Sequence, residues 1–431
     1  MKNRAEVILW GTHIGYVYLD DNSRYMTFEY DQNFINSGIE VSPLVMPLSE
    51  RLYSFPELNY EAFHGAPGLI ADSLPDTFGN AIINRWLSEN GRLPDSFNAI
   101  ERLCYTGNRG MGALEYIPST GPDNTMEENV NIDALVRLAE EVLSRRQNVH
   151  INISDNTALA NLLKMGTSAG GARAKAIIAW NEDTGDMRSG QIDAGSGYTY
   201  WIIKFDKVAG SGDHGLVDSP EYTCIEYAYY LMAKDAGIEM SDCRLFEENN
   251  RKHFMTKRFD RNPSTGDKIH MQTLGALTHT DYNIPGLLSY EQAALYAKKL
   301  GLSHTEIIKL FRQMVFNVLA VNQDDHVKNI SFLMDRSGNW SLAPAYDMTF
   351  AYNESNRWLK AHQMTINNKT INISIEDLVA AGSSMDITGI KCMSIISEVR
   401  QAVDNWLYHA ETAGVRQQKA EMIGNIINNC R

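Results

Sequence analysis

A short polar stretch decides how this chain is expected to fold: Asn322-Gln323-Asp324-Asp325-His326-Val327-Lys328-Asn329. It follows Glu306–Val321, an amphipathic run whose apolar residues recur at helical spacing. A strand-like run, Ile330–Met334, comes directly after it. The polar stretch is therefore expected to connect a helix to a strand, and connections of this kind often hold reactive groups on a rigid scaffold.

Two residues of the stretch have the spacing of a catalytic loop. Asp324 and Asn329 form the pattern Asp-x-x-x-x-Asn, in which protein kinases use the aspartate to accept a hydroxyl proton and the asparagine to hold magnesium. The turn Asp335–Asn339 predicts a hairpin that returns the chain to Asp347. Asp347 is expected to lie near Asn329 as a second magnesium ligand, because this cation prefers oxygen ligands and binds few protein groups besides substrate phosphates.

Two other interpretations of these residues remain open. The same pattern is typical of a solvated helix end followed by an ordinary hairpin. Alternatively, Asp324, Asp325 and His326 form a metal-dependent hydrolase site, although the sequence contains no His-Glu-x-x-His motif.

Composition limits the class of protein. A chain of 431 residues is too long for one compact core, so two or three packed units are expected. The net charge of −14 argues against a large sequence-independent surface for nucleic acid. Five cysteines without Cys-x-x-Cys spacing indicate reduced thiols in a cytosolic protein. No apolar run approaches membrane-spanning length and the first ten residues lack a signal-peptide core, so the protein is expected in the cytoplasm.

The first 120 residues are expected to form a small α+β subdomain without a catalytic constellation. It ends at a polar, Gly- and Pro-containing linker, Pro118–Asn129. The predicted strands are Glu6–Trp10, Gly15–Leu19, Met26–Tyr30, Val45–Leu48 and Ala113–Ile117, and the predicted helices are Thr77–Glu89 and Phe97–Cys104.

Residues 130–261 are expected to form a β-rich lobe that binds ATP, after helices at Ile132–Arg146 and Asp155–Met165. The Gly-rich loop Gly166–Lys175 precedes a strand, and successive backbone amides in such a loop can cradle phosphate. Lys204 lies in the strand-like run Tyr200–Asp206, where a lysine either faces solvent at a sheet edge or binds nucleotide phosphates.

Two further parts of this lobe follow. The predicted helix Pro220–Ala236 carries Glu221 and Glu226, either of which could pair with Lys204. The predicted strand Phe254–Arg261 has the position of a kinase hinge.

Residues 262–431 are expected to be mostly helical. The predicted helices are Tyr290–Leu300, Glu306–Val321, Ile375–Ala381, Thr388–Glu411 with a break, and Val415–Asn429. The order of the parts is Gly-rich loop, strand lysine, helix glutamate, hinge, Asp-x-x-x-x-Asn and a late aspartate. This order predicts an α+β, bilobal, protein-kinase-like fold with a β-rich lobe before a helical lobe.

The sequence also resembles a known family. Asp324-x-His326-x-Lys328-Asn329, followed by Ala343-Pro344-x-x-Asp347, resembles the HipA family, the kinase toxins of bacterial toxin–antitoxin modules. The resemblance covers nearly the whole chain. It extends to the family's N-terminal motif, Gly-rich loop and post-hinge segment at Gly107–Leu114, Gly171–Lys175 and Arg258–Arg261. One departure is Lys257, at the expected adenine contact, where family members often carry an acidic residue.

The resemblance implies a serine/threonine protein kinase that uses ATP and magnesium. It implies Asp324 as catalytic base, Asn329 and Asp347 as magnesium ligands and Lys204 as a phosphate ligand. Lys328 is expected from its position to follow the transferred phosphate. The other residues expected at the nucleotide are Gly170, Gly171, Ala172, Arg173, Lys175, Glu226, Arg258 and Phe259. Ser168 matches a serine that family members autophosphorylate, with Thr167 as an alternative acceptor.

The resemblance implies partners as well. In the family these are small helix-turn-helix antitoxins that bind DNA as dimers, and protein substrates that include aminoacyl-tRNA synthetases. The acidic charge balance fits a protein that reaches DNA through such a partner. Two alternatives remain: a small-molecule kinase of the aminoglycoside or sugar type, and a catalytically idle corepressor scaffold in an antitoxin–DNA complex.

Overall fold

The computed structural model describes residues 3–20, 22–121, 131–144, 173–191, 193–208 and 221–430. Contacts divide the chain into two compact units. The first unit comprises Met1–Glu40, Leu48–Thr223 and Arg244–Met271, and the second comprises Val41–Pro47, Cys224–Cys243 and Gln272–Arg431. The predicted division at residues 120, 130 and 261 stays a prediction.

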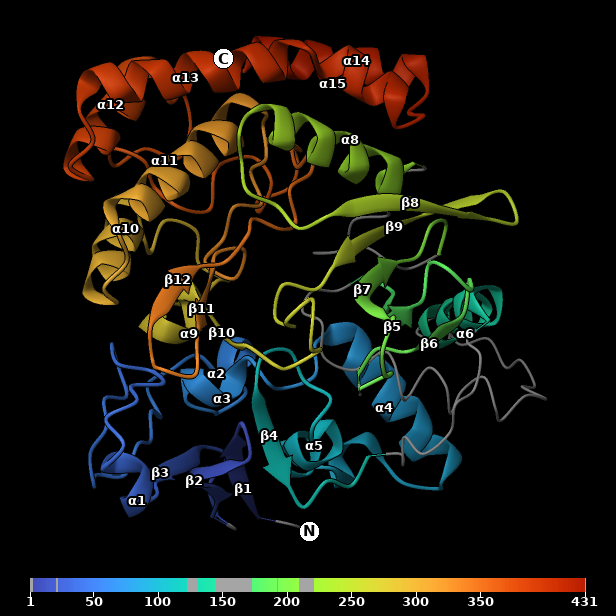
Figure 1. Ribbon diagram of the computed structural model, residues 1–431, viewed down its shortest axis with the longest axis vertical. Helices are drawn as coiled ribbons and strands as arrows, with labels where there is room; N and C mark the ends of the chain where they lie inside the picture. The colour runs from blue at the N-terminus through green and yellow to red at the C-terminus, as the bar shows by residue number, and fades with distance from the viewer. Residues whose placement is uncertain are drawn as a thin grey trace. The chain divides into compact units, whose positions relative to one another are not determined.

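The N-terminal part of the first unit is built on a four-stranded antiparallel sheet (Figure 1). Its order is β3-β2-β1-β4. The strands are β1 (Arg4–Leu9), β2 (Thr12–Leu19), β3 (Met26–Tyr30) and β4 (Leu114–Ile117), and the helices of this part include α1 (Gln32–Ile35), α2 (Tyr60–Phe63), α3 (Gly68–Ala71) and α5 (Ala99–Thr106), with a 3₁₀ turn at Pro94–Ser96. Helix α5 packs on β1, β2 and β4.

The strand predicted at Val45–Leu48 is wrong. Residues 41–47 form turns and bends, and Met46 N donates to Ser42 O at 2.9 Å. Pro47 lies inside the predicted strand and Pro43 two residues before it, and a proline cannot donate to a strand ladder.

A five-stranded sheet forms the second part of the first unit. Its order is β6-β5-β7-β9-β8, with strands β5 (Lys175–Trp180), β6 (Met187–Ser189), β7 (Thr199–Lys204), β8 (Cys243–Glu248) and β9 (Arg251–Lys257). Helices α4 (Thr77–Glu89) and α6 (Ile132–Ser144) share its buried core with Ala176 and Ile178 of β5 and Trp201 of β7. Since side chains alternate along a strand, residues 175, 177, 202 and 204 lie on the opposite face.

The second unit is mostly helical (Figure 1). Its helices are α8 (Tyr222–Asp235), whose first two residues belong to the first unit, and then α9 (Leu274–Thr278), α10 (Tyr290–Lys299), α11 (His304–Leu319), α12 (Ile375–Ser384), α13 (Gly389–Asp404), α14 (Trp406–Thr412) and α15 (Gln417–Asn429). The predicted break in 388–411 falls at Asn405, between α13 and α14. Helix α11 packs on α10 and α13, and most of its residues from Leu310 to Leu319 are buried.

The predicted hairpin after the polar stretch is confirmed. Strands β11 (Ser331–Met334) and β12 (Trp340–Leu342) pair antiparallel, and β10 (His270–Thr273) completes a three-stranded sheet of order β10-β11-β12. The α+β fold class is confirmed too. The helix predicted at Asp155–Met165 lies outside the described residues. Within the described ranges, no helix is both long and apolar enough to span a bilayer.

Candidate active site

The polar stretch begins where α11 ends in a sharp turn. Val321 has a φ of +56°, which a β-branched residue rarely adopts. This turn lets Asn322 N donate to Asn317 O at 2.9 Å and Gln323 N donate to Ala351 O at 2.9 Å. The chain is thereby redirected from the helix into the loop, and strain of this kind is characteristic of functional sites.

Asn329 closes the loop that contains Asp324. Its side-chain Nδ2 donates to the main-chain oxygen of Asp324 at 2.8 Å, and its main-chain N donates to His326 O at 2.8 Å. Because Nδ2 is held by the loop, the amide is fixed with Oδ1 as its remaining polar atom. Within the described residues no donor is bonded to that oxygen, which is the atom a magnesium ion takes from an asparagine.

The two adjacent aspartates point to different environments. The side chain of Asp324 is 27% exposed, and its Oδ1 lies 4.0 Å from His326 Nε2. The side chain of Asp325 is fully buried. Of these two aspartates, Asp324 is therefore the one whose carboxylate is accessible.

The hairpin returns the chain to the loop. Phe332 of β11 pairs with Leu342 of β12, and the hydroxyl of Tyr346 then donates to Lys328 O at 2.6 Å. The residue after Tyr346 is Asp347, whose φ of +52° again lies in the left-handed region. The side chain of the residue before Asp347 is thus bonded to the residue before Asn329.

Lys328 lies against an aromatic side chain. Its Nζ is 4.2 Å from the ring centroid of Tyr282, and the same ring packs edge-on against His326 with centroids 5.7 Å apart. A cation over a ring face is attracted by the ring quadrupole. Tyr282 therefore restricts where the Lys328 ammonium can lie beside the loop.

Asn329 and Asp347 are of the residue types that magnesium takes as protein ligands. One amide oxygen and one carboxylate, from Asn329 and Asp347, match the few oxygen ligands that this ion takes from proteins when phosphates and water supply the rest. Among the described residues, no group of three or more His, Cys, Asp or Glu side chains is placed to hold a metal ion.

Lys204 ends β7 in the first unit and is partly exposed. It lies directly opposite Lys175 of β5, and its Nζ is 5.8 Å from the ring centroid of Phe254. Like charges opposite each other on adjacent strands repel. Lys175 is compensated by a buried ion pair, since its Nζ lies 3.1 Å from Asp76 Oδ2.

Arg258 is held in a buried charge network in the first unit. Its guanidinium donates to both carboxylate oxygens of Asp260, at 2.8 and 2.7 Å. Asp260 also accepts from Arg261 Nη1 at 2.9 Å and from Gly112 N at 2.7 Å. The network joins the Gly107–Leu114 motif to the post-hinge segment. Because the Arg258 side chain is committed to it, a nucleotide contact by Arg258 stays a prediction.

The remaining predicted site residues are distributed between the two units. The Arg173 guanidinium lies 3.2 Å from the ring centroid of Tyr222. Phe259 is partly buried after β9, and Glu226 is buried in α8. Since Glu226 and Lys204 belong to different units, their pairing stays a prediction. Ser168, Thr167, Gly170, Gly171 and Ala172 lie outside the described residues.

Three residues make contacts in these networks that the sequence does not predict. The sequence indicates Asp325 only as part of a hydrolase site and assigns no role to Tyr346 or Asp260. Each acts through partners distant in the chain, and no local pattern separates them from ordinary polar residues.

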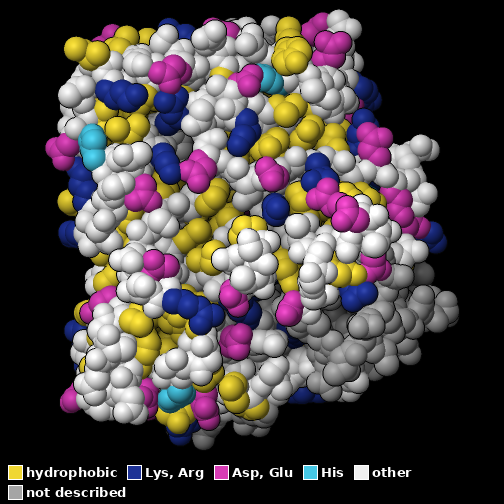
Figure 2. All heavy atoms as spheres, viewed as in Figure 1, with side chains coloured by type: hydrophobic (Ala, Val, Ile, Leu, Met, Phe, Trp, Pro, Cys, Tyr) yellow, Lys and Arg dark blue, Asp and Glu magenta, His cyan; other side chains and the backbone are white. Residues whose placement is uncertain are grey.

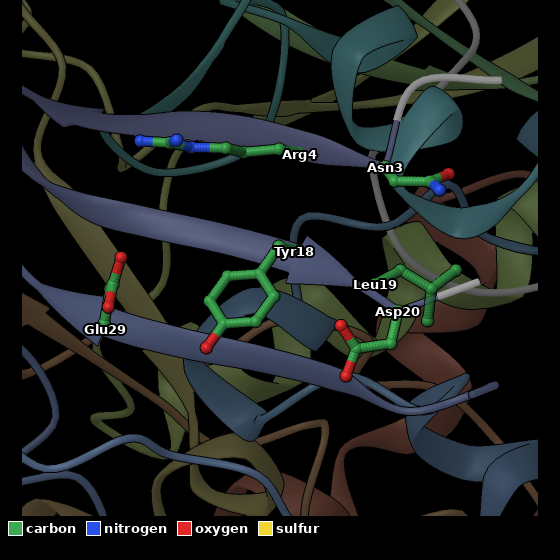
Figure 3. Close-up of a pocket in the computed structure, with 6 residues that line it drawn as sticks. All are labelled: Asn3, Arg4, Tyr18, Leu19, Asp20 and Glu29. Carbon is green, nitrogen blue, oxygen red and sulfur yellow. The ribbon is translucent and has the colours of Figure 1, made fainter. Parts of the chain in front are cut away.

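The surface has two further features to compare with the predicted site. Figure 2 shows Lys and Arg side chains interspersed with Asp and Glu on the face in view, without a broad basic patch among the side chains that are described. Figure 3 shows an open hollow on the N-terminal sheet, lined by Asn3, Arg4, Tyr18, Leu19, Asp20 and Glu29. It gathers charges of both signs and none of the predicted site residues.

Comparison with protein families gives two matches. Residues 167–407, more than half of the chain, match the HipA-like C-terminal domain, and residues 5–117 match the HipA N-terminal domain.

Two curated relatives match over part of their length. A Haemophilus influenzae protein named "Putative kinase" is 32% identical over 169 residues, covering 34% of this chain and 48% of the relative. "Putative kinase Y4mE" of Sinorhizobium fredii is 27% identical over 131 residues, covering 28% of this chain and 31% of the relative. The matched stretches therefore span about half and about a third of these relatives.

A solved structure matches over almost the whole chain. It is HipA of the Shewanella oneidensis MR-1 toxin–antitoxin system, in a complex with HipB and its operator DNA. The TM-score is 0.62 at 16% identity, over 98% of this chain and 95% of that chain. The predicted kinase-like α+β fold is thereby confirmed.

Proposed function

The chain belongs to the HipA-like family, and from this premise we propose that it is an ATP- and magnesium-dependent serine/threonine protein kinase. The observation that carries the proposal is the bond from Asn329 Nδ2 to Asp324 O. It holds the proposed base and a proposed magnesium ligand in one closed loop. The names of the two curated relatives support a kinase.

Each proposed role follows from the placement of a side chain. Asp324, partly exposed, accepts the proton of the acceptor hydroxyl. Asn329 and Asp347 hold magnesium, which neutralises phosphate charge when bound. Lys328, restrained by Tyr282, lies beside the same loop and follows the transferred phosphate.

The first unit supplies positive charge for the nucleotide. Lys204 and Lys175 lie opposite each other on β7 and β5, and Lys175 also pairs with the buried Asp76. A phosphate at Lys204 adds negative charge beside the strand pair that carries both lysines. The Gly-rich loop that precedes β5, with Gly170, Gly171, Ala172 and Arg173, completes the proposed phosphate site.

The test compares aspartate variants. Asp324→Ala and Asp347→Ala are expected to lower transfer of labelled phosphate from ATP by at least about 1,000-fold, because each removes a group that acts on the reacting atoms. Asp386→Ala is the matched control, since that carboxylate is 78% exposed and pairs with Lys298 on the surface of the same unit. Circular dichroism checks the fold. Near-normal transfer by either active-site variant contradicts the proposal.

The acceptor residue is addressed by mass spectrometry. The proposal includes autophosphorylation at Ser168, so phosphate is expected there after incubation with ATP and magnesium and absent in Asp324→Ala. Phosphoproteomics after induced expression then identifies protein targets, among which an aminoacyl-tRNA synthetase is proposed. Activity on a small molecule with no phosphorylated protein supports the small-molecule kinase instead.

We further propose that the protein is the toxin of a toxin–antitoxin module and binds a small helix-turn-helix antitoxin. The fold likeness to HipA from a complex with HipB and operator DNA supports this partner. The net charge of −14 supports DNA contact mainly through the antitoxin. Growth arrest on expression, relieved by the neighbouring small gene, is the expected result. Binding of the isolated protein to DNA without that partner contradicts the proposed arrangement.

A further inference from the structure

Asp325 is a buried carboxylate with a complete set of donors. Its Oδ1 accepts from Gln363 N at 2.7 Å, and its Oδ2 accepts from the hydroxyl of Tyr290 at 3.0 Å. His362 Nδ1 lies 2.9 Å from the same Oδ2 and must donate, because a carboxylate only accepts. A fully buried carboxylate such as that of Asp325 is costly in a fold unless its oxygens accept hydrogen bonds.

The donors extend from Asp325 back to the start of the loop. Asn317 Nδ2 of α11 donates to the Tyr290 hydroxyl at 2.8 Å, and Asn322 Nδ2 donates to Asn317 Oδ1 at 2.9 Å. Burial and the charge of Asp325 raise the pKa of Tyr290 well above its ordinary value, which keeps its hydroxyl a donor. The network therefore connects α10 and α11 with Asn322, at the start of the loop, and with Asp325.

Asp325 binds a segment later in the chain, residues 361–366, which is also held by main-chain hydrogen bonds. Gly286 N donates to Gln363 O at 2.8 Å, and His362 N donates to Thr370 O at 2.9 Å. Tyr290 N donates to Thr365 O at 3.0 Å. Asp325 thus bonds the segment at His362 and Gln363 to the catalytic loop.

We infer that Asp325 is a positioning residue, which fixes the catalytic loop by binding the segment at His362 and Gln363 through its buried carboxylate. The inference rests on the proposed kinase function. The neighbouring base, Asp324, shares a peptide bond with Asp325, so a shift of one moves the other. Displacement of a catalytic group by about 1 Å costs about 100-fold in rate.

Two substitutions separate charge from shape. Asp325→Ala leaves Gln363 N, the Tyr290 hydroxyl and His362 Nδ1 without their acceptor. It is expected to lower kcat by about 100-fold and to change the KM for ATP by less than about 2-fold. Asp325→Asn keeps an oxygen for Gln363 N and is expected to lower kcat by about 10-fold, a partial rescue that a general loss of folding does not produce.

The control variant tests for a merely structural effect. Ile423→Ala makes a cavity at a fully buried position in α15, and Ile423 has no bond to the loop. It is expected to lower stability and leave kcat per folded molecule unchanged. Hydrogen exchange gives a readout that needs no activity. Peptides covering 361–366 and 324–329 are expected to exchange faster in Asp325→Ala and as in the parent in Ile423→Ala.

The outcomes are distinguishable. An active parent protein with an unchanged kcat in Asp325→Ala overturns the inference and leaves the proposed function intact. Unchanged exchange in both peptides overturns it as well, whether or not the protein is a kinase. A parent protein that transfers no phosphate from ATP refutes the proposed function and with it the positioning role, while faster exchange still reports the bond between Asp325 and the segment.

Discussion

Replacing Asp260 by alanine is expected to destabilise the first unit strongly. Asp260 is fully buried and accepts from Arg258, Arg261 and Gly112. Burial alone would raise its pKa, but Arg258 and Arg261 override this and hold the pKa well below its usual range. Asp260→Ala therefore leaves two buried guanidinium groups facing each other.

The size of the effect follows from the charges left behind. Removing one partner of a buried ion pair costs about 3–5 kcal/mol. Burial and repulsion by Arg258 already lower the pKa of Arg261 to about 10, although Asp260 opposes this, so removing Asp260 disfavours the charged guanidinium further. In a unit of about 240 residues this cost lowers the unfolding midpoint by on the order of 10 °C.

The assay is thermal unfolding of the full chain, with hydrogen exchange at Gly112 as the local readout. Glu182→Ala is the matched control, because it breaks a surface ion pair with Arg244 in the same unit, worth about 0–1 kcal/mol. The folded pKa of Asp260 is lowered, so its contribution is complete above the unfolded value near 4 and is lost as pH falls through the folded pKa. A midpoint within about 2 °C of the control at pH 7 refutes this account of the network.

Two other predictions concern one residue in each unit. Burial lowers the pKa of His253 to about 4. The unfolded chain takes up this proton near pH 6.5, so the folded protein loses up to about 3 kcal/mol as pH falls from 6.5 to 4. His253→Asn keeps an acceptor for Asp206 N and is expected to reduce the dependence of the unfolding free energy on pH, as measured by urea unfolding at several pH values. An unchanged pH dependence contradicts this role of His253. Tyr346→Phe removes the hydroxyl bonded to Lys328 O and is expected to lower kcat about 10-fold by initial rates; an unchanged kcat would mean that the hairpin alone positions Asp347.

Elements with strong local signals could be predicted from the sequence. Helix α4 runs from Thr77 to Glu89 as expected, because Asp76 caps its start and Asn90-Gly91 ends it. The turn Asp335–Asn339 could be predicted as well, because Asp, Ser, Gly and Asn are typical turn residues. The carboxylate of Asp335 accepts from Ser337 N and Asn339 N, which fixes the hairpin locally.

Elements that depend on distant partners could not be predicted. Strand β6 has three residues and exists through pairing with β5. Lys175 and Lys204 are both strand lysines in sequence, and only the fold shows that Asp76 neutralises one of them. Asp324 and Asp325 are adjacent and of the same type, so the sequence does not tell which one is exposed. Asp325 is buried because of contacts with residues as distant in the chain as Gln363.

The two units are interleaved along the chain, and this limits how the protein can be dissected or synthesised. Val41–Pro47 and Cys224–Cys243 belong to the second unit, yet both precede the end of the first at Met271. No single cleavage point releases either unit whole. A truncation at residue 271 leaves Val41–Pro47 and Cys224–Cys243 without the rest of the second unit. During translation, α8 leaves the ribosome well before α11. The hydrogen bond from the hydroxyl of Tyr229 to Ala320 O can form only after about ninety more residues are made. Early termination products of this gene are therefore expected to be substrates for proteolysis, not active fragments.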